Sequence, residues 1–271
     1  MASTVLITGA SQGIGKATTL LLAQKGYDIV LAARQADRLE AVASEVRSFG
    51  RKALAVPTDV RDPDQVHTLV QKALDYYSAI NVLINNAGIY LLAPVEECSL
   101  KDWHQVIDTN LWGYIHMIHA LLPHFLNRGS GTIINVGSIG GKIPISYQTP
   151  YTTSKYAITG LTEALHAELA PKGIHVCGIH PNFIKTSLME RAIFRGKDKQ
   201  DVHQRHELVE NALNSPVLEE PEKVAQAIWE ALKHQKSEVM VGSAKLSNAS
   251  YQLFPGFLQW IFRKTFGTNE N

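Results

Sequence analysis

The chain has 271 residues, of which 45% are hydrophobic and 19% are charged. This balance is typical of a globular protein and excludes low-complexity disorder, collagen and coiled coil for the chain as a whole. With 26 Lys and Arg against 25 Asp and Glu, the net charge of +1 provides no broad basic surface, so we expect no nucleic-acid partner. The length predicts one large domain with a short extension.

Short β-branched segments alternate with longer amphipathic ones along most of the chain. Helices are expected at 13–25, 35–48, 63–78, about 99–127, 150–170 and 221–234. Strands are expected at 4–8, 28–33, 52–57, 80–85, 131–137, 174–179 and 238–242. The alternation predicts βαβ units with right-handed crossovers, and therefore an α/β fold with a seven-stranded parallel sheet flanked by helices.

A glycine-rich turn, TGASQGIG, follows the first expected strand at residues 8–15. Glycines allow a tight turn and a close approach to a pyrophosphate, and the next helix offers N–H donors at its N-terminus. In a first βαβ unit this pattern predicts a doubly wound, Rossmann-type dinucleotide-binding domain. The turn residues expected to bind the cofactor are Gly9, Ser11, Gln12, Gly13, Ile14 and Gly15.

The end of the second expected strand indicates which dinucleotide is preferred. NAD-selective folds usually place an acidic residue there, about 20 residues after the glycines. This chain instead has Ala32, Ala33 and Arg34. Because a guanidinium can pair bidentately with a 2′-phosphate, the sequence favours NADP(H) over NAD(H).

Tyr151 and Lys155 are four residues apart on an expected helix, so they share one face. A neighbouring ammonium favours the phenolate, so we expect Lys155 to lower the pKa of Tyr151. Tyr151 could then act as a general acid in reduction or a general base in oxidation. Ser138 follows the fifth strand, at the sheet edge where α/β proteins bind ligands, and its hydroxyl can hold a carbonyl oxygen.

The glycine turn, NNAG at 85–88, Asn110, Ser138 and YTTSK at 151–155 together resemble the short-chain dehydrogenase/reductase family. The resemblance covers about residues 3–242 and suggests an NADP-preferring, carbonyl reductase-like member. It implies hydride transfer between nicotinamide C4 and a carbonyl carbon. It assigns catalysis to Asn110, Ser138, Tyr151 and Lys155, with Lys155 also holding the nicotinamide ribose and Asn110 ordering a water in a proton relay.

Further binding residues carry over from the same resemblance. Asp59 and Val60 match the pair beside the adenine. Asn86, Ala87 and Gly88 match the stretch along the adenine ribose. Segment 181–186 matches the nicotinamide segment, with Pro181, Ile184 and Thr186 as cofactor contacts. Asn182 replaces the glycine usual in that segment, and we expect it, with Ser138, Tyr147 and Tyr151, to line the substrate pocket.

Two segments depart from the alternating pattern. Residues 185–216 are polar and basic, and we interpret them as a substrate lid or a surface excursion. The catalytic domain is expected at 1–242, followed by an extension at 243–271. Segment 251–266 of that extension holds six of the 21 aromatic residues. Three interpretations stay open for it, namely a cap on the substrate cleft, a contact with a second subunit, or a peripheral membrane contact.

The sequence as a whole predicts an NADPH-dependent reductase for a small ketone or aldehyde. The alternatives are an alcohol or hydroxysteroid-type dehydrogenase using NAD(P)+, and a non-catalytic NADPH-binding protein. We expect a homo-oligomer, dimer or tetramer, located in the cytoplasm, because neither a signal peptide nor a spanning segment is visible. We expect no metal, because His116 and His119 provide too few ligands.

Overall fold

The computed structural model describes residues 2–185, 192–213, 218–256 and 260. Within them, seven parallel strands form one sheet in the order β3-β2-β1-β4-β6-β7-β9. These strands are β1 (Thr4–Thr8), β2 (Asp28–Ala33), β3 (Ala53–Pro57), β4 (Val82–Asn85), β6 (Gly131–Val136), β7 (Ile174–His180) and β9 (Glu238–Met240). The chain winds outward from β1 on one side and then from β4 on the other. The predicted doubly wound fold is therefore confirmed.

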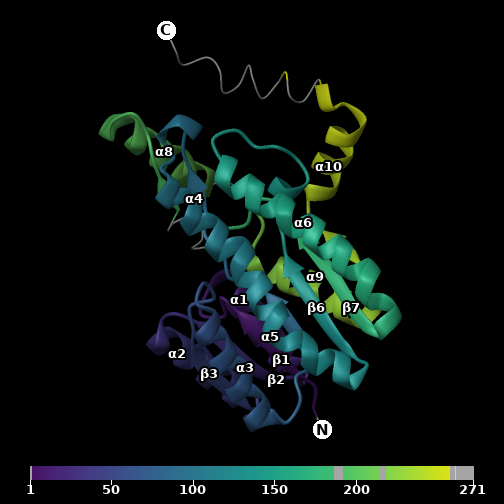
Figure 1. Cartoon of the computed structure of the whole chain (residues 1–271). Coiled ribbons are helices and arrows are strands. Elements are labelled where there is room, and N and C mark those ends of the chain that lie inside the picture. The colour runs from purple at the N-terminus through teal and green to yellow at the C-terminus, as the bar shows by residue number, and fades with distance from the viewer. Residues whose placement is uncertain (1, 186–191, 214–217, 257–259, 261–271) are drawn as a thin grey trace.

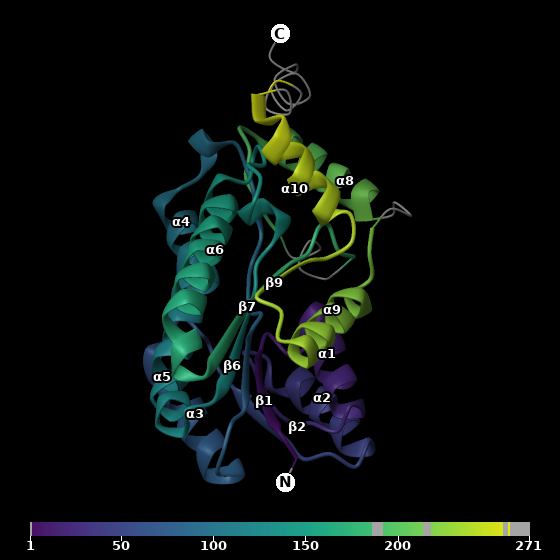
Figure 2. The same ribbon diagram turned by 90° about the vertical axis from the view of Figure 1, so that its right-hand side faces the viewer.

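Helices cover both faces of the sheet, as Figure 2 shows. One face packs against α1 (Gly13–Gln24), α2 (Ala36–Ser48) and α9 (Pro221–His234). The other packs against α3 (Pro63–Tyr77), α5 (Gly113–Arg128) and α6 (Thr149–Leu169). Strand β1 shows why: Val5 and Ile7 enter one core while Leu6 enters the other, and all three are fully buried. Such continuous apolar strands are what burial on both faces requires.

Local sequence sets where several of these helices begin. Asp62 caps α3, because its carboxylate accepts hydrogen bonds from the backbone N–H groups of Asp64 and Gln65. Ser99 and Asp102 form a reciprocal capping box at the start of α4 (Leu100–Ile107). Pro150 occupies the first turn of α6, where its missing N–H has no helical partner to lose. The start of α6 places Tyr151 and Lys155, which line the pocket described below.

The long helix expected at about 99–127 is interrupted. Helix α4 ends at Ile107, a π-helical segment, η2, covers Asp108–Trp112, and α5 continues from Gly113. Hydrophobic periodicity could not show this break, because one wide turn only shifts the phase of the pattern. π-Helical turns occur frequently at functional sites, and this one contains Asn110.

Several elements of the described chain were not expected. They are β5 (Leu91–Leu92) paired with β8 (Ile193–Phe194), α8 (Lys199–Leu213), α10 (Ala244–Leu253), and the short turns η1 (Val95–Glu97), η3 (Ile139–Gly141) and η4 (Ala170–Lys172). Figures 1 and 2 place α4, α8 and α10 at one end of the molecule, opposite the N-terminus. No helix in the described part of the chain is long and apolar enough to cross a bilayer.

Candidate active site

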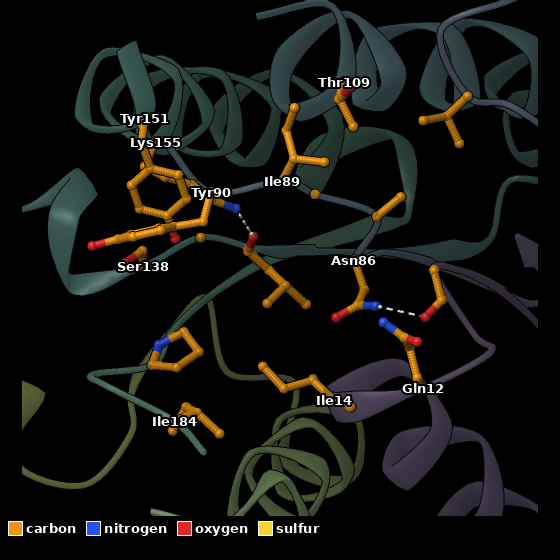
Figure 3. Close-up of a pocket in the computed structure, with 18 of the residues that line it drawn as sticks. Gln12, Ile14, Asn86, Ile89, Tyr90, Thr109, Ser138, Tyr151, Lys155 and Ile184 are labelled. Atoms are coloured by element: carbon orange, nitrogen blue, oxygen red, sulfur yellow. Dashed lines mark hydrogen bonds between the residues drawn. The ribbon is translucent and has the colours of Figure 1, made fainter. Parts of the chain in front are cut away.

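A pocket lies at the carboxyl ends of the strands, at the switch point between β1 and β4 (Figure 3). Open α/β sheets bind ligands at this place. Most of the residues predicted from the sequence line it, namely Gly9, Ser11, Gln12, Gly13, Ile14, Arg34, Asp59, Val60, Asn86, Ala87, Gly88, Ser138, Tyr151, Lys155, Pro181, Asn182 and Ile184. Gly15, Asn110 and Tyr147 lie outside this lining, and Thr186 lies outside the described residues.

The glycine turn is packed too tightly for side chains. Gly9 has φ +66°, and a Cβ on it would lie 2.8 Å from Nδ2 of Asn86. A Cβ on Gly15 would lie 2.1 Å from the carbonyl oxygen of Gly9. Gly15 therefore does not line the pocket itself. Its lack of a side chain lets the first turn of α1 lie directly against the glycine turn. The result is a backbone cradle that a bulkier residue would fill.

The same turn offers hydrogen-bond donors suited to a phosphate. Gln12 stands at the N-cap of α1 without bonding the helix through its side chain, so the first N–H groups of α1 keep no side-chain cap. The Gln12 Oε1 accepts a hydrogen bond of 2.9 Å from Nη1 of Arg38. The Gln12 Nε2 is buried and has no hydrogen-bond partner within the described chain. Free N–H groups at a helix N-terminus favour an anion, so the residues present fit a dinucleotide phosphate.

Positive charge gathers at the far end of the cradle. Arg34 follows β2, is exposed, lines the pocket and forms no ion pair among the described residues. Asp59 follows β3, the strand paired with β2, and its carboxylate accepts hydrogen bonds from Arg61, which hold the pKa of that carboxyl below its usual value. Arg38 adds a second guanidinium beside the turn through its bond to Gln12. The sequence reasoning missed Arg38, although its place in the first turn of α2, four residues after Arg34, was a usable signal.

Helix α6 brings Tyr151 and Lys155 onto one face, pointing toward Ser138 (Figure 3). Both are buried, with exposed fractions of 7% and 5%. The Lys155 Nζ donates to the carbonyl oxygen of Val136 at 2.9 Å and lies 5.7 Å from the centroid of the Tyr151 ring. The phenol and the amine, from α6, and the hydroxyl of Ser138, from the loop after β6, therefore meet at the inner end of the pocket.

Burial sets the charge state of this group. It raises the pKa of Tyr151, although a hydrogen bond with the Ser138 side chain acts in the opposite direction. Burial also lowers the pKa of Lys155 to about 8. The expected lowering of the Tyr151 pKa by Lys155 is therefore not found. The reason is desolvation, which disfavours both the phenolate and the ammonium.

Asn110 lies behind the pocket, where it holds two elements together. Its Oδ1 accepts from the backbone N–H of Ile89 at 2.8 Å, and its Nδ2 donates to the Ile89 carbonyl and to Oγ of Ser154, both at 3.0 Å. Ser154 in turn donates to the Tyr151 carbonyl at 2.6 Å. This network ties the π-helical segment to the loop after β4 and to α6. Ser154 was not predicted, although it directly precedes Lys155 in the YTTSK motif.

Two aromatic residues differ from expectation. Tyr90, not predicted, is buried in the pocket wall, with its ring edge-on to that of Tyr151 at 4.9 Å between centroids. Tyr147 was predicted to line the substrate pocket, but its backbone has φ +60° and its ring lies under the guanidinium of Arg205 at 4.7 Å. The structure thus places Tyr147 against α8.

Asn182, where the family resemblance implies a glycine, lines the pocket. Its backbone is outside the left-handed region, and its Nδ2 donates to Oγ of Ser243 at 2.6 Å. Asn182 therefore connects the segment after β7 to the start of α10. A glycine could not make this side-chain bond.

An ion-pair network supports the loop that follows Ser138. Glu238 contacts Nε2 of the buried His180 at 3.2 Å and Nζ of Lys142 at 2.6 Å, and Lys142 also pairs with Glu163. Hydrogen bonding to His180 and Lys142 lowers the pKa of Glu238 to about 2. The network joins β7, β9 and α6 to the turn η3. This network could not be predicted from the sequence, because the four residues are far apart along the chain.

The described parts of segment 185–216 are attached to the body of the protein. Strand β8 pairs with β5, and Arg195 makes two hydrogen bonds, of 2.6 and 3.2 Å, with the buried carboxylate of Asp102. Arg205 pairs with Asp201 within α8. Two basic residues of this segment are therefore already neutralised by acidic partners.

The doubly wound sheet and the pocket at its switch point define a dinucleotide-binding α/β enzyme. Residues 3–196 match the model of the short chain dehydrogenase family. A cyclohexanol dehydrogenase of Acinetobacter sp. (strain SE19) is 35% identical, with 91% of this chain and 93% of that protein covered. The chain belongs to the short-chain dehydrogenase/reductase family of oxidoreductases, which confirms the resemblance seen in the motifs.

Solved structures agree with this assignment. A short-chain dehydrogenase/reductase from Burkholderia phymatum in complex with NAD is 26% identical and superposes with a TM-score of 0.86, covering 95% of each chain. A short-chain dehydrogenase from Sphingobium yanoikuyae in complex with NADPH is 28% identical, with a TM-score of 0.76 and coverage of 94% of this chain and 96% of that one. Structural neighbours thus bind either dinucleotide.

Proposed function

We propose that this protein is an NADPH-dependent reductase that converts a ketone or aldehyde into the alcohol. One observation carries the proposal: the same pocket holds Tyr151, Ser138 and Lys155 at one end and the glycine cradle with Arg34 at the other. A dinucleotide that spans the pocket from Arg34 would bring its nicotinamide toward Tyr151.

The cofactor-binding part of the proposal follows from the cradle. Gly9, Gln12 and the N-terminus of α1 would hold the pyrophosphate. Arg34 would pair with a 2′-phosphate, because β2 ends without a carboxylate that could hold a ribose 2′-hydroxyl. Asp59, Val60 and 86–88 would line the adenosine half, and 181–186 the nicotinamide half. Solved structures that resemble this chain include both NAD and NADPH complexes, so they do not distinguish the two cofactors. The choice of NADPH over NADH is supported by Arg34.

The chain's own residues would handle the proton. The bound cofactor supplies the hydride. Ser138 would hold the substrate oxygen, and Tyr151 would donate its phenolic proton to that oxygen. The raised pKa of Tyr151 keeps the phenol protonated at neutral pH, as a general acid requires. Lys155, with a pKa of about 8, would hold the next proton to be passed on.

The remaining parts of the proposal concern boundaries and direction. We assign 1–242 to the catalytic domain, 185–216 to a substrate lid and 243–271 to the extension. The attachment of the lid through β8 and Arg195 supports this division. The alternative direction, oxidation of an alcohol with NAD(P)+, uses the same residues with Tyr151 as the base, and the similarity to cyclohexanol dehydrogenase favours it.

The test compares cofactors. We expect NADPH to be consumed faster than NADH in a screen of ketones graded by size and charge. Arg34→Asp should lower kcat/KM with NADPH by about 10- to 100-fold, since a hydrogen bond to a charged group contributes about 1.5–3 kcal/mol. Arg47→Met, which removes an arginine paired with Glu40 on α2, is the matched control and should leave kcat/KM with NADPH unchanged. Equal or higher efficiency with NADH would refute the NADPH preference.

A further inference from the structure

Two buried polar side chains in the pocket have no hydrogen-bond partner in the part of the chain that the structure describes. Gln148 is 4% exposed and Tyr90 is 6% exposed, and both line the pocket that contains Tyr151 and Ser138. Neither the Gln148 amide nor the Tyr90 hydroxyl bonds another described residue. Because an unpaired buried polar group is unfavourable, two such groups in one pocket indicate a ligand that pairs with them.

Gln148 stands at the N-cap of α6, three residues before Tyr151. Side chains at this position commonly accept a hydrogen bond from the first turn of the helix, but the Gln148 side chain makes no such bond. Its amide is also not sealed from solvent, in contrast to Nε2 of Gln12, and the opening that Gln148 lines is the pocket. The amide is therefore available to a molecule bound next to Tyr151.

The residue before Gln148 makes an unusual turn. Tyr147 has φ +60°, a left-handed conformation that residues other than glycine rarely adopt. Its carbonyl oxygen accepts a hydrogen bond of 2.8 Å from the N–H of Ala93, and its ring lies 4.7 Å from the guanidinium of Arg205. Contacts on both sides thus hold the turn, with Tyr147 against α8 and Gln148 in the pocket wall. Strained turns of this kind often occur at binding sites.

Tyr90 comes to the same part of the pocket from another segment of the chain. Its ring is edge-on to that of Tyr151, with 4.9 Å between centroids, and Figure 3 shows the two side by side next to Ser138. The Tyr90 carbonyl accepts from the N–H of Ile193, so the pairing of β5 with β8 holds this residue. Burial raises the pKa of Tyr90, so its phenol stays protonated. The phenol and the Gln148 amide are therefore both neutral.

Apolar side chains make up much of the wall near these two groups. Ile89, Ile139, Ile145 and Phe183 line the same pocket. No residue of α10 does so, and the described part of the extension therefore does not cap the cleft. An apolar wall with two neutral hydrogen-bonding groups suits an uncharged ligand that has an apolar frame and few polar atoms.

We propose that Gln148 and Tyr90 form a second polar subsite, which binds a hydroxyl or carbonyl oxygen that the substrate carries in addition to its reacting carbonyl. The inference rests on the proposed function, in which Ser138 and Tyr151 take the reacting oxygen. An amide and a phenol can each donate and accept, so the pair suits either kind of oxygen. The substrate is then a neutral hydroxyketone or diketone. A ketone without a second oxygen leaves both groups unpaired and is the poorer substrate.

The test compares ring ketones of one size, with NADPH as the reductant. We expect at least one of the hydroxycyclohexanones and cyclohexanediones to exceed cyclohexanone in kcat/KM by about tenfold, mainly through a lower KM. Whether the hydroxyl or the second carbonyl gives the larger gain identifies the preferred oxygen. Gln148→Leu with Tyr90→Phe should lower the ratio of the two kcat/KM values to about one. The ratio cancels a general loss of activity, because both substrates experience it equally.

The matched control makes the same two chemical changes on α3, none of whose residues lines the pocket. Gln71→Leu with Tyr76→Phe should leave the ratio unchanged. A wild-type ratio near one, or an unchanged ratio in the Gln148 and Tyr90 variant, would overturn the subsite and leave the reductase proposal intact.

A failure of the proposed function is recognised separately. If none of these ketones is reduced, the reductase proposal is wrong, and the subsite is then tested in the oxidative direction. There the ratio compares cyclohexanediols with cyclohexanol in the presence of NADP+ or NAD+, and a ratio of about ten that falls to about one in the variant would support the subsite. No turnover of any of these compounds in either direction would overturn both proposals.

Discussion

Replacing Lys155 by methionine is expected to stabilise the folded protein while removing its activity. Lys155 is 5% exposed, and burial lowers the pKa of its amine from 10.5 to about 8. At about 1.4 kcal/mol for each pH unit, holding the ammonium in the folded state at neutral pH costs roughly 3 kcal/mol. Methionine has a similar length and carries no charge, so it removes this cost.

The substitution also loses one hydrogen bond, from Lys155 Nζ to the Val136 carbonyl. That carbonyl still accepts from the Tyr114 hydroxyl at 2.9 Å, so the loss is about 1 kcal/mol. The net gain is about 2 kcal/mol, which raises Tm by about 5 °C in a chain of this size. Differential scanning calorimetry of the protein without cofactor measures this directly.

The pH dependence gives the sign of the effect. Below pH 8 both folded and unfolded chains hold the Lys155 proton, so the cost is fully present. Between pH 8 and 10.5 only the unfolded chain keeps the Lys155 proton, so the stability of the wild type rises with pH. The difference in stability between Lys155→Met and the wild type therefore closes. Lys142→Met is the matched control, and it should destabilise because it breaks ion pairs with Glu163 and Glu238. A Lys155→Met variant less stable than the wild type at pH 7 would show that the buried Lys155 ammonium does not destabilise the fold.

Three further predictions test the cradle, the ion-pair network and the proton donor. Gly15→Ala places a Cβ 2.1 Å from the Gly9 carbonyl and should weaken NADPH binding at least about tenfold by fluorescence titration. Gly160→Ala, with open space around the new Cβ, should instead stabilise α6 by up to about 1 kcal/mol and leave binding intact. Glu238 has a folded pKa of about 2 against 4.5, so the wild type loses stability as pH falls through that window. Glu238→Gln should remove that loss in acid melts, about 1 kcal/mol because the side chain is 43% exposed. The kcat for ketone reduction should fall above about pH 8, as Lys155 loses its proton, and a flat profile to pH 10 would contradict this role.

The fold could be predicted from the sequence because each strand is a short apolar segment that continues into a glycine or polar turn. β1, for instance, was predicted at the residues where the structure has it. The break at Asp108–Trp112 could not be predicted from periodicity, and the Asn110 side chain within it hydrogen-bonds Ile89 and Ser154, which lie far away in the chain. The two-residue strands β5 and β8 are likewise too short to show any periodicity.

The position of the pocket could be predicted from the motifs, because these motifs lie at the ends of the strands. Residues at the ends of parallel strands meet at one edge of the sheet, so Gly9, Asn86 and Ser138 could be placed together in advance. Contacts that depend on side-chain packing could not. The position of Tyr147 under Arg205 requires the placement of α8. The raised pKa of Tyr151 requires the depth of burial, which spacing along a helix does not reveal. The oligomeric state stays a prediction.

The central claim is that the Tyr151 phenol donates the proton in an NADPH-dependent reduction. The most direct test is the turnover of Tyr151→Phe with an accepted ketone, measured together with its affinity for NADPH. We expect turnover to fall by about 10²–10⁴-fold, the usual contribution of a general acid, while NADPH binds almost as tightly as to the wild type. A Tyr151→Phe variant that binds NADPH and reduces the ketone at the wild-type rate would contradict it.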